Sequence, residues 1–307
     1  MTLIAFSGAV QLGLVFSLLA LGIFVAYRIL GVPDLTVEGS FTAGAAVSAV
    51  FVVAGRPFIG LFVSIFVGAL AGMCTAFLQT KLRVQPILAG ILTMMAAFSV
   101  NLAIMGGRPN IPLLREVTMF NLLGDGFGSI QAARFFLPSV VVFIAAALLG
   151  VFFHTRLGLA VRATGDNEDM CRASSINTTK TKFVGLAIGN ALAALSGGIV
   201  AQYQGFADIN MGFGMVVVAL ASLIIGEAIF GRRSVIWNIG SVIVGAVIYR
   251  IIWAWAFGFR IDPANLRALS AIIVAAAISF PAIKNMWKLH RLKYAARRTR
   301  KSNRNTT

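Results

Sequence analysis

Acidic side chains are scarce in this sequence and gather in a few places where they could do chemistry. Of ten Asp and Glu residues among 307, three lie within four positions, at Asp166, Glu168 and Asp169. Four others lie in or beside apolar runs: Asp34, Glu38, Asp208 and Glu227. Carboxylates in such places can carry a proton along a pathway, pair with arginine or favour a helix N-terminus. Because no His-rich site accompanies the lone acidic cluster and no Cys or His spacing resembles a metal site, we expect neither a catalytic residue nor a metal site.

The elements that hold these acids are apolar enough to decide the class of the chain. Hydrophobic residues make up 59% and charged residues 12%, and the mean hydropathy is +0.89. The apolar residues form charge-free blocks of about 18 to 24, the length of helix that crosses about 30 Å of hydrocarbon. Strands of a β-barrel would instead alternate over about ten residues. We therefore predict an all-α polytopic membrane protein, a bundle of eight or nine helices with broken or re-entrant segments.

Nine blocks are predicted to span the membrane, and eight is the alternative count. They cover residues 5–27, 38–54, 58–79, 86–106, 135–153, 182–202, 212–230, 235–256 and 267–286. Glycines four residues apart, such as Gly68 and Gly72, favour close packing of helices in a membrane. We expect residues 1–286 to form a single transmembrane domain, followed by a basic tail at 287–307.

The net charge of +16 comes from Lys and Arg residues that collect at a few sites. They lie at Lys81 and Arg83, within 156–182, at Arg232 and Arg233, and in the tail. Since positively charged loops stay in the cytoplasm, an odd span count predicts an external N-terminus and a cytoplasmic C-terminus. A basic tail after a span is typical of contact with anionic lipid headgroups, so we expect lipid partners and no nucleic acid.

The segment between the first two predicted spans, GVPDLTVEGSFTAGAA (31–46), interrupts the helical pattern. Pro33 lacks a backbone N–H and pushes the preceding residue away from helical geometry. One interpretation is a helix broken inside the membrane, which requires burial in protein or a water-filled cavity. The other is a plain cytoplasmic loop in which Thr36 or Ser40 caps the next helix and Glu38 is favoured by its dipole.

A second segment repeats part of this pattern. Asp208-Ile-Asn-Met precedes an apolar block as Asp34-Leu-Thr-Val does, which suggests an internal duplication of the kind that encloses substrate paths in transporters. Glu227 lies near a span end beside Arg232, so an ion pair there is favoured over a proton relay. Asp34, Glu38, Asp208 and Glu227 are the candidate residues of a translocation pathway.

The polar insertion RATGDNEDMCRASSINTTKTK (162–182) is predicted to contain a short helix outside the bilayer. Asp166 is the expected N-cap, with Asp169 at the third helical position as in a capping box. The helix is expected at about 167–174, and Thr178 or Thr179 is expected to cap the next span. An ordinary solvated connecting loop is the alternative.

Three stretches resemble a known family. Ala163, Gly165 and Asn167 form the pattern A-x-G-x-N, followed by CRASSI and a Gly- and Ala-rich span. This resembles the coupling segment of permease subunits of the branched-chain amino acid and ribose type of ABC importers. Residues 27–46 and 212–249 are similar to two further blocks of that family, and together they most resemble its tryptophan-type subgroup. Met170 and Cys171 replace the usual alanine pair, and Ser175 stands where the family prefers glycine.

The resemblance implies a permease of an ATP-binding cassette importer in a prokaryotic inner membrane. The implied partners are an ATPase subunit, an extracytoplasmic solute-binding protein and a second copy of the chain. The segment 155–182 would couple to the ATPase through Gly165, Asn167, Glu168, Asp169 and Arg172. The implied substrate is a small organic solute, an amino acid and, from the subgroup, an aromatic one.

ATP would be bound by the partner, because no G-x-x-x-x-G-K-[ST] phosphate loop occurs in the sequence. The chain is therefore expected to carry no cofactor of its own and to be no enzyme. A proton-coupled secondary transporter that uses Asp34, Glu38 and Glu227 is the alternative that the residues themselves leave open.

Overall fold

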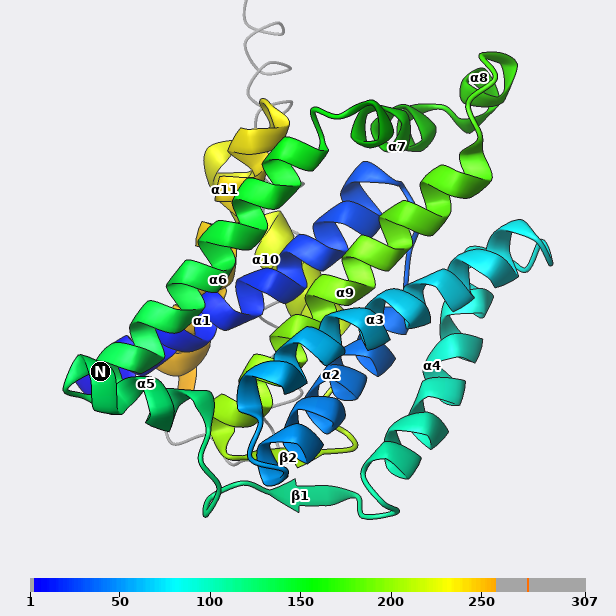
Figure 1. The fold of residues 1–307 in the computed structure, drawn as a ribbon. Coiled ribbons are helices and arrows are strands. Elements are labelled where there is room, and N and C mark those ends of the chain that lie inside the picture. The colour runs from blue at the N-terminus through cyan, green and yellow to red at the C-terminus, as the bar shows by residue number, and fades with distance from the viewer. Residues whose placement is uncertain (1–2, 258–274, 276–307) are drawn as a thin grey trace, which may run out of the picture. The chain divides into compact units, whose positions relative to one another are not determined.

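The computed structural model describes residues 3–257 and residue 275, and Met1–Arg260 forms one compact unit. Helices make up most of the described chain (Figure 1). They are α1 (Leu3–Ile23), the π-helix η1 (Phe24–Ile29), α2 (Thr36–Val53), α3 (Pro57–Thr80), α4 (Pro86–Ile104), α5 (Met119–Phe127), α6 (Ile130–Phe152), α7 (Arg156–Asp166), α8 (Glu168–Ala173), α9 (Thr178–Gln204), α10 (Met215–Phe230) and α11 (Val235–Phe257). Two short strands, β1 (Asn110–Pro112) and β2 (Phe206–Asp208), pair antiparallel with Ile111 opposite Ala207.

Seven helical segments of the described residues are long and apolar enough to cross a membrane. They are Ala5–Ile29, Thr36–Val53, Pro57–Thr80, Pro86–Ile104, Ile130–Phe152, Thr178–Gln204 and Val235–Ala256. The all-α polytopic class is thus confirmed. The predicted span 212–230 is shorter than expected, because α10 begins only at Met215 and has 16 residues. The ninth predicted span, 267–286, and the basic tail lie outside the described residues.

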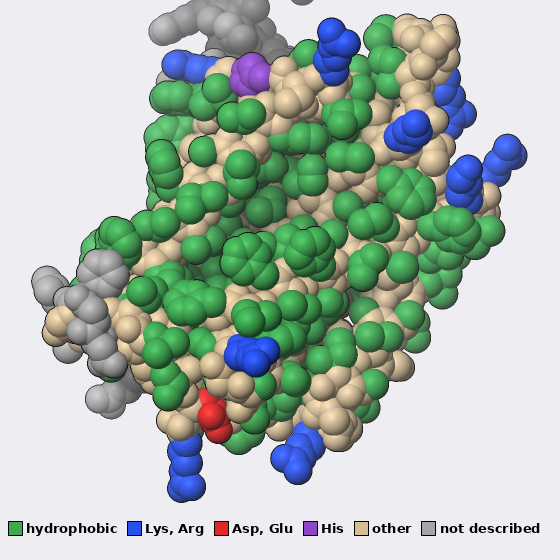
Figure 2. Space-filling model, in the orientation of Figure 1, with side chains coloured by type: hydrophobic (Ala, Val, Ile, Leu, Met, Phe, Trp, Pro, Cys, Tyr) green, Lys and Arg blue, Asp and Glu red, His purple; other side chains and the backbone are tan. Residues whose placement is uncertain are grey.

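The bundle has two distinct ends. Helices α7 and α8 lie at one end, which we call the α8 end, and the β1–β2 pair lies at the other, the strand end (Figure 1). The chain enters α1 near the strand end, and α9 leads from α8 to β2. On the face shown in Figure 2, apolar side chains cover the middle between these ends, and most Lys and Arg side chains lie toward the ends. That distribution is the one expected for a protein whose middle faces lipid.

Helix α9 packs closely against α2 and α3 through small residues. A side chain added at Gly68 or Gly72 of α3 would collide with the α9 backbone at Asn190 or Leu186. Gly44 of α2 faces the backbone of α9 in the same way. The predicted packing role of the glycines four residues apart is therefore confirmed, and it fixes α9 against its neighbours at backbone distance.

Candidate functional site

The polar insertion contains the end of α7, the short helix α8 and the first turn of α9, and asparagines rather than the predicted residues cap α8 and α9. The Oδ1 of Asn167 accepts a hydrogen bond from the backbone N–H of Met170 at 3.0 Å and caps α8. The Oδ1 of Asn177 accepts from the N–H of Lys180 at 3.0 Å and caps α9. The prediction of Asp166 as N-cap is wrong, because Asp166 is the last residue of α7, and the predicted capping box with Asp169 does not form. A cap at Thr178 or Thr179 is also wrong for α9. The predicted short helix itself is confirmed, since α8 runs over 168–173.

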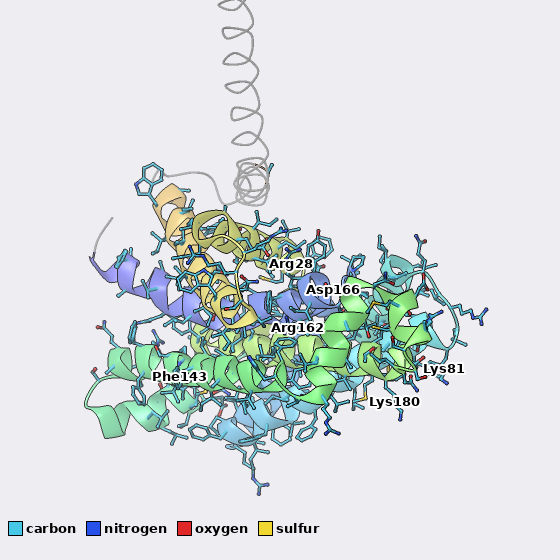
Figure 3. The ribbon with its side chains drawn as sticks, turned by 90° about the horizontal axis from the view of Figure 1, so that it is seen from above. Arg28, Lys81, Phe143, Arg162, Asp166 and Lys180 are labelled. Atoms are coloured by element: carbon cyan, nitrogen blue, oxygen red, sulfur yellow. The ribbon has the colours of Figure 1, made fainter. Side chains whose placement is uncertain are left out.

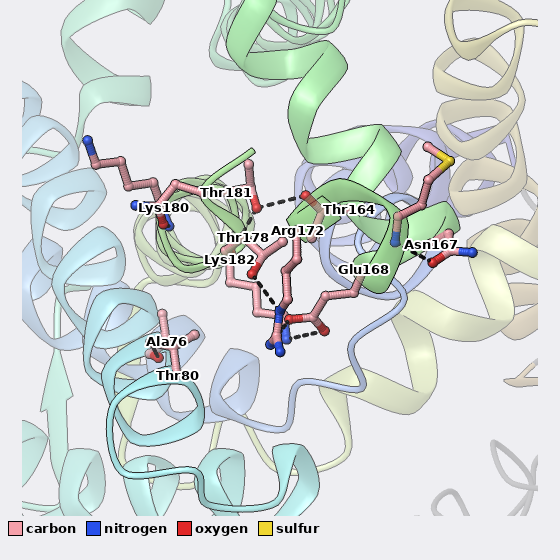
Figure 4. A network of polar contacts seen from close by, with 12 residues as sticks. Ala76, Thr80, Thr164, Asn167, Glu168, Arg172, Thr178, Lys180, Thr181 and Lys182 are labelled. Carbon is pink, nitrogen blue, oxygen red and sulfur yellow. Dashed lines mark hydrogen bonds and ion pairs between the residues drawn. The ribbon is translucent and has the colours of Figure 1, made fainter. Parts of the chain in front are cut away.

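Glu168 links α8 to the first turn of α9 through an ion pair (Figure 4). Its Oε1 lies 2.7 Å from Nη2 of Arg172, and its Oε2 lies 2.7 Å from Nζ of Lys182. Partial burial raises the pKa of Glu168, but the hydrogen bonds and charges of Lys182 and Arg172 outweigh burial and lower it below 4.5. The Nε of Arg172 also donates to Oγ1 of Thr178 at 3.4 Å. Glu168 is thus engaged within the chain, and α8 is held to α9 by a charged carboxylate.

The other residues predicted for coupling divide into exposed and packed ones. Asn167, Asp169 and Arg172 are exposed on α8, and so is Met170 between them. Gly165 of α7 lies against the backbone of Ile29, where any side chain would collide. Glycine there allows the close approach of α7 to the end of η1, so Gly165 acts through packing, whereas the exposed residues are accessible to a partner.

Ser175 departs from the glycine that the resemblance predicts at this position, and its backbone conformation shows why glycine suits it. Its φ is +61°, in the left-handed region that glycine adopts more readily than residues with a side chain. A chain reversal between α8 and α9 therefore favours glycine at this position, as in the family. Serine at this position therefore has some backbone strain.

A polar cavity of about 550 Å³ lies between α8, the first turn of α9 and the turn after α3. It is lined by Gln79, Thr80, Arg83, Glu168, Arg172, Thr178, Thr179 and Lys182. Seen from the α8 end, Arg28, Lys81, Arg162, Asp166 and Lys180 lie across this end of the bundle, and Phe143 belongs to α6 (Figure 3). Basic residues from η1, from the turn after α3 and from the polar insertion thus lie at the α8 end.

Glu227, near the end of α10, is held by two arginines. Its Oε1 lies 2.8 Å from Nε of Arg28, and its Oε2 lies 2.7 Å from Nη2 of Arg232. The predicted ion pair with arginine is therefore confirmed. Arg28, which comes from the π-helix η1 more than 190 residues earlier in the sequence, could not have been foreseen from local spacing.

The break between α1 and α2 is partly buried, and its acid Asp34 lies inside the protein. Asp34 is only 3% exposed, and its Oδ1 accepts from the N–H of Thr36 at 2.9 Å. Its Oδ2 accepts from Nδ2 of Asn190 of α9 at 2.7 Å. Neither Thr36 nor Ser40 caps α2 as predicted, because the Thr36 hydroxyl bonds Thr75 and the Ser40 hydroxyl donates to Asn190. Asp34 thus supplies the acceptors that the broken backbone and its neighbour need.

A second break, between β2 and α10, meets the start of α2. The N–H of Gly212 donates to Oγ1 of Thr42 at 3.0 Å, and the N–H of Gly214 donates to Oε1 of Glu38 at 3.0 Å. Glu38 therefore caps α10, a helix from the distant part of the chain. Before this break, Oδ1 of Asp208 accepts from the N–H of Asn210 at 2.8 Å, the same turn that Asp34 makes. The suggested pattern repeat thus has a matching local geometry.

A cavity of about 220 Å³ opens where the second break meets α2 and α4. Among the four predicted pathway acids, only Glu38 lines it. Asp34 supports the first break, Asp208 lies at the strand end beside Asn110, and Glu227 lies in its arginine cluster. Asn101 of α4 also lines the cavity and is 1% exposed. An isolated amide inside an apolar block is the sequence feature that could have pointed to it.

Comparison with known proteins agrees with these features. Residues 5–278 match the family described as branched-chain amino acid transport system / permease component. The tyrosine transport system permease protein of Clostridioides difficile is 36% identical over 87% of this chain and 88% of that protein. The ribose import permease of Escherichia coli is 25% identical over 87% and 80%, respectively.

Among solved structures, a metal-chelate type ABC transporter in an inward-facing conformation resembles the chain. The TM-score is 0.50 at 15% identity, covering 91% of this chain and 85% of the other, so the likeness concerns the fold alone. Both this likeness and the relatives agree with a helical bundle of several membrane spans. The chain therefore belongs to the family of permease components of the branched-chain amino acid transport type, as a multi-pass membrane protein.

Proposed function

We propose that this chain forms the translocation pathway of an ATP-driven importer of an aromatic amino acid. Membership of the permease family supports the transport role, and the tyrosine transport relative supports the substrate. The ribose permease shows that related chains serve other solutes, so the substrate is the finer part of the proposal. The chain has no catalytic residue or cofactor in this scheme, because ATP belongs to a separate ATPase subunit.

The observation that carries the proposal is the attachment of α8 to α9. Asn167, Asp169 and Arg172 offer polar contacts on the exposed side of α8, and Glu168 joins its inner side to Lys182 of α9. A displacement of α8 by a partner would pass to α9, and from α9 to α2 and α3 through the backbone contacts at the glycines. Such a rigid-body motion between two packings is how a docked ATPase would open or close a pathway.

In this proposal, the α8 end faces the cytoplasm of a prokaryotic cell. The basic residues around Lys81, Arg83 and Arg232 support this orientation, which leaves the N-terminus outside. An extracytoplasmic solute-binding protein would deliver substrate at the strand end, and a second copy of the chain would complete the pathway. Lipid headgroups would meet the basic residues at the α8 end.

The pathway would run past the cavity between α2, α4 and the second break. Glu38 lies in that cavity, whereas Asp34 and Asp208 shape the breaks and Glu227 holds the end of α10 to η1. The two arginines on Glu227 also argue against a proton relay, because a relay carboxylate must exchange its partner during each cycle.

Reconstitution in vesicles tests the proposal. The purified chain is combined with a partner ATPase and solute-binding protein, and uptake of radiolabelled tyrosine is measured with ATP on the ATPase side. We expect uptake only when all three proteins and ATP are present. Uptake by the chain alone, driven by a proton gradient without the ATPase, would contradict the proposal.

A further inference from the structure

The cavity between α2, α4 and the second break has a composition that selects a particular kind of ligand. It encloses about 220 Å³, below the range of about 300 to 1,000 Å³ typical of sites for drug-sized molecules. Its walls come from α2, α4 and the segment before α10. A ligand that fits must therefore be small and must contact three separate elements at once.

Two of the polar side chains that line this cavity, Glu38 and Asn101, carry acceptor oxygens. Oε1 of Glu38 receives the N–H of Gly214, and within residues 3–257 no lysine or arginine forms an ion pair with Glu38. Asn101 donates from Nδ2 to the carbonyl oxygen of Gly39 at 3.1 Å, which fixes its amide orientation. Its Oδ1 is buried and has no hydrogen-bond partner in the described part of the chain. A buried acceptor without a donor destabilises the chain, and a half-buried carboxylate favours a cation.

The remaining walls are apolar and polarisable. Met94, Met95 and Phe98 of α4 and Phe213 before α10 line the cavity. Methionine sulfur and aromatic rings make favourable contacts with an aromatic ligand, and aromatic faces also attract ammonium groups. Phe98 is 47% exposed and Phe213 72%, so they lie at the rim where a ligand enters.

We propose that this cavity is a binding site for the amino group of the substrate. The carboxylate of Glu38 and Oδ1 of Asn101 accept from the ligand ammonium, and the ligand ring lies among Met94, Phe98 and Phe213. This assignment rests on the proposed import of an aromatic amino acid and locates its recognition in the permease itself. The site recognises the ammonium and the ring, and it contains no cationic side chain for the ligand carboxylate.

Binding to the full-length chain in lipid nanodiscs tests this assignment. Three probes are compared: tyrosine, tyramine, which lacks the carboxylate, and 3-(4-hydroxyphenyl)propionate, which lacks the amine. We expect tyrosine and tyramine to bind and the propionate not to bind. Glu38→Gln keeps the size and the acceptor for Gly214, yet removes the charge, so tyramine affinity should fall about 10- to 100-fold.

Two further variants separate recognition from folding. Phe98→Ala changes a partly exposed side chain and should weaken tyramine binding several-fold while the chain stays folded. Glu116→Gln removes a carboxylate that does not line the cavity and should leave binding unchanged. Equal tyramine affinity in wild type and Glu38→Gln would overturn the assignment, as would absent tyramine binding or tight binding of the propionate.

The vesicle assay keeps this inference distinct from the proposed function. If ATP-dependent tyrosine uptake occurs but Glu38→Gln does not change tyramine affinity, the proposed import is supported and the proposed recognition site is refuted. If no ATP-dependent uptake occurs, the proposed function is refuted, independently of the binding result for the cavity.

Discussion

The substitution Glu168→Gln should release α8 from α9 without unfolding the bundle. It removes the negative charge that lies 2.7 Å from both Arg172 and Lys182. An exposed ion pair contributes about 0.2–1 kcal/mol and a hydrogen bond to a charged group about 1.5–3 kcal/mol. Lys182 is 19% exposed and Glu168 31%, so we take about 1–3 kcal/mol for the pair of contacts together. That free energy corresponds to about 5- to 150-fold in the population of detached α8.

Hydrogen–deuterium exchange of the amides in 168–173 measures this population. We expect faster exchange in Glu168→Gln, with the amides of α3 and α9 beyond the first turn unchanged. Asp169→Asn is the matched control, because Asp169 is the neighbouring carboxylate on the exposed side of α8. Lys182→Gln should have a similar effect, and the double variant should be less than additive. Unchanged exchange in Glu168→Gln would refute the attachment of α8 through this carboxylate.

Three other perturbations test separate parts of the structure. Asp34→Ala removes the acceptors for Thr36 and Asn190 and should destabilise the chain by several kcal/mol, since each orphaned donor costs about 1–3 kcal/mol; an unchanged melting temperature in detergent would contradict the buried break. Ser175→Gly relieves a φ of +61° and should stabilise α8 by up to about 1 kcal/mol, so faster exchange of α8 in this variant would argue against strain there. The pKa of Glu168 is lowered from 4.5, so the contribution of its charge to the attachment of α8 is present above that pH and is lost as pH falls through the lowered value. Hydrogen exchange of the α8 amides, corrected for intrinsic rates, should be constant between about pH 8 and 5 and should rise in stronger acid. Loss of protection already at pH 6 would contradict this prediction.

Much of the fold could be predicted from the sequence, because block length and hydropathy determine which segments can cross a membrane. The predicted span 212–230 was too long, since the helix begins only after a turn whose Gly212 packs against α2. The predicted N-caps of α8 and α9 are wrong because neighbouring residues have side chains that can accept the same hydrogen bonds. Asn167 and Asp166 can each accept the same backbone hydrogen bonds, and only the length of α7 decides between them.

The candidate site was less predictable, because its contacts join residues far apart in the chain. Asp34 is held by Asn190, 156 positions away, and Glu38 caps α10 through Gly214, 176 positions away. Local spacing can identify such carboxylates as unusual in an apolar chain, but it cannot say what they bind. Whether Glu38 forms part of a pathway remains the prediction that the binding and uptake measurements address.

The central claim, that α8 is the contact for an ATPase, is tested most directly by site-specific crosslinking. A photoreactive residue replaces Met170, which is 56% exposed on α8, or Phe143, which is 74% exposed on the apolar side of α6. We predict crosslinks from position 170 to the ATPase subunit in the assembled importer and none from position 143. Absence of crosslinks at 170 in a complex that still takes up substrate would contradict the account.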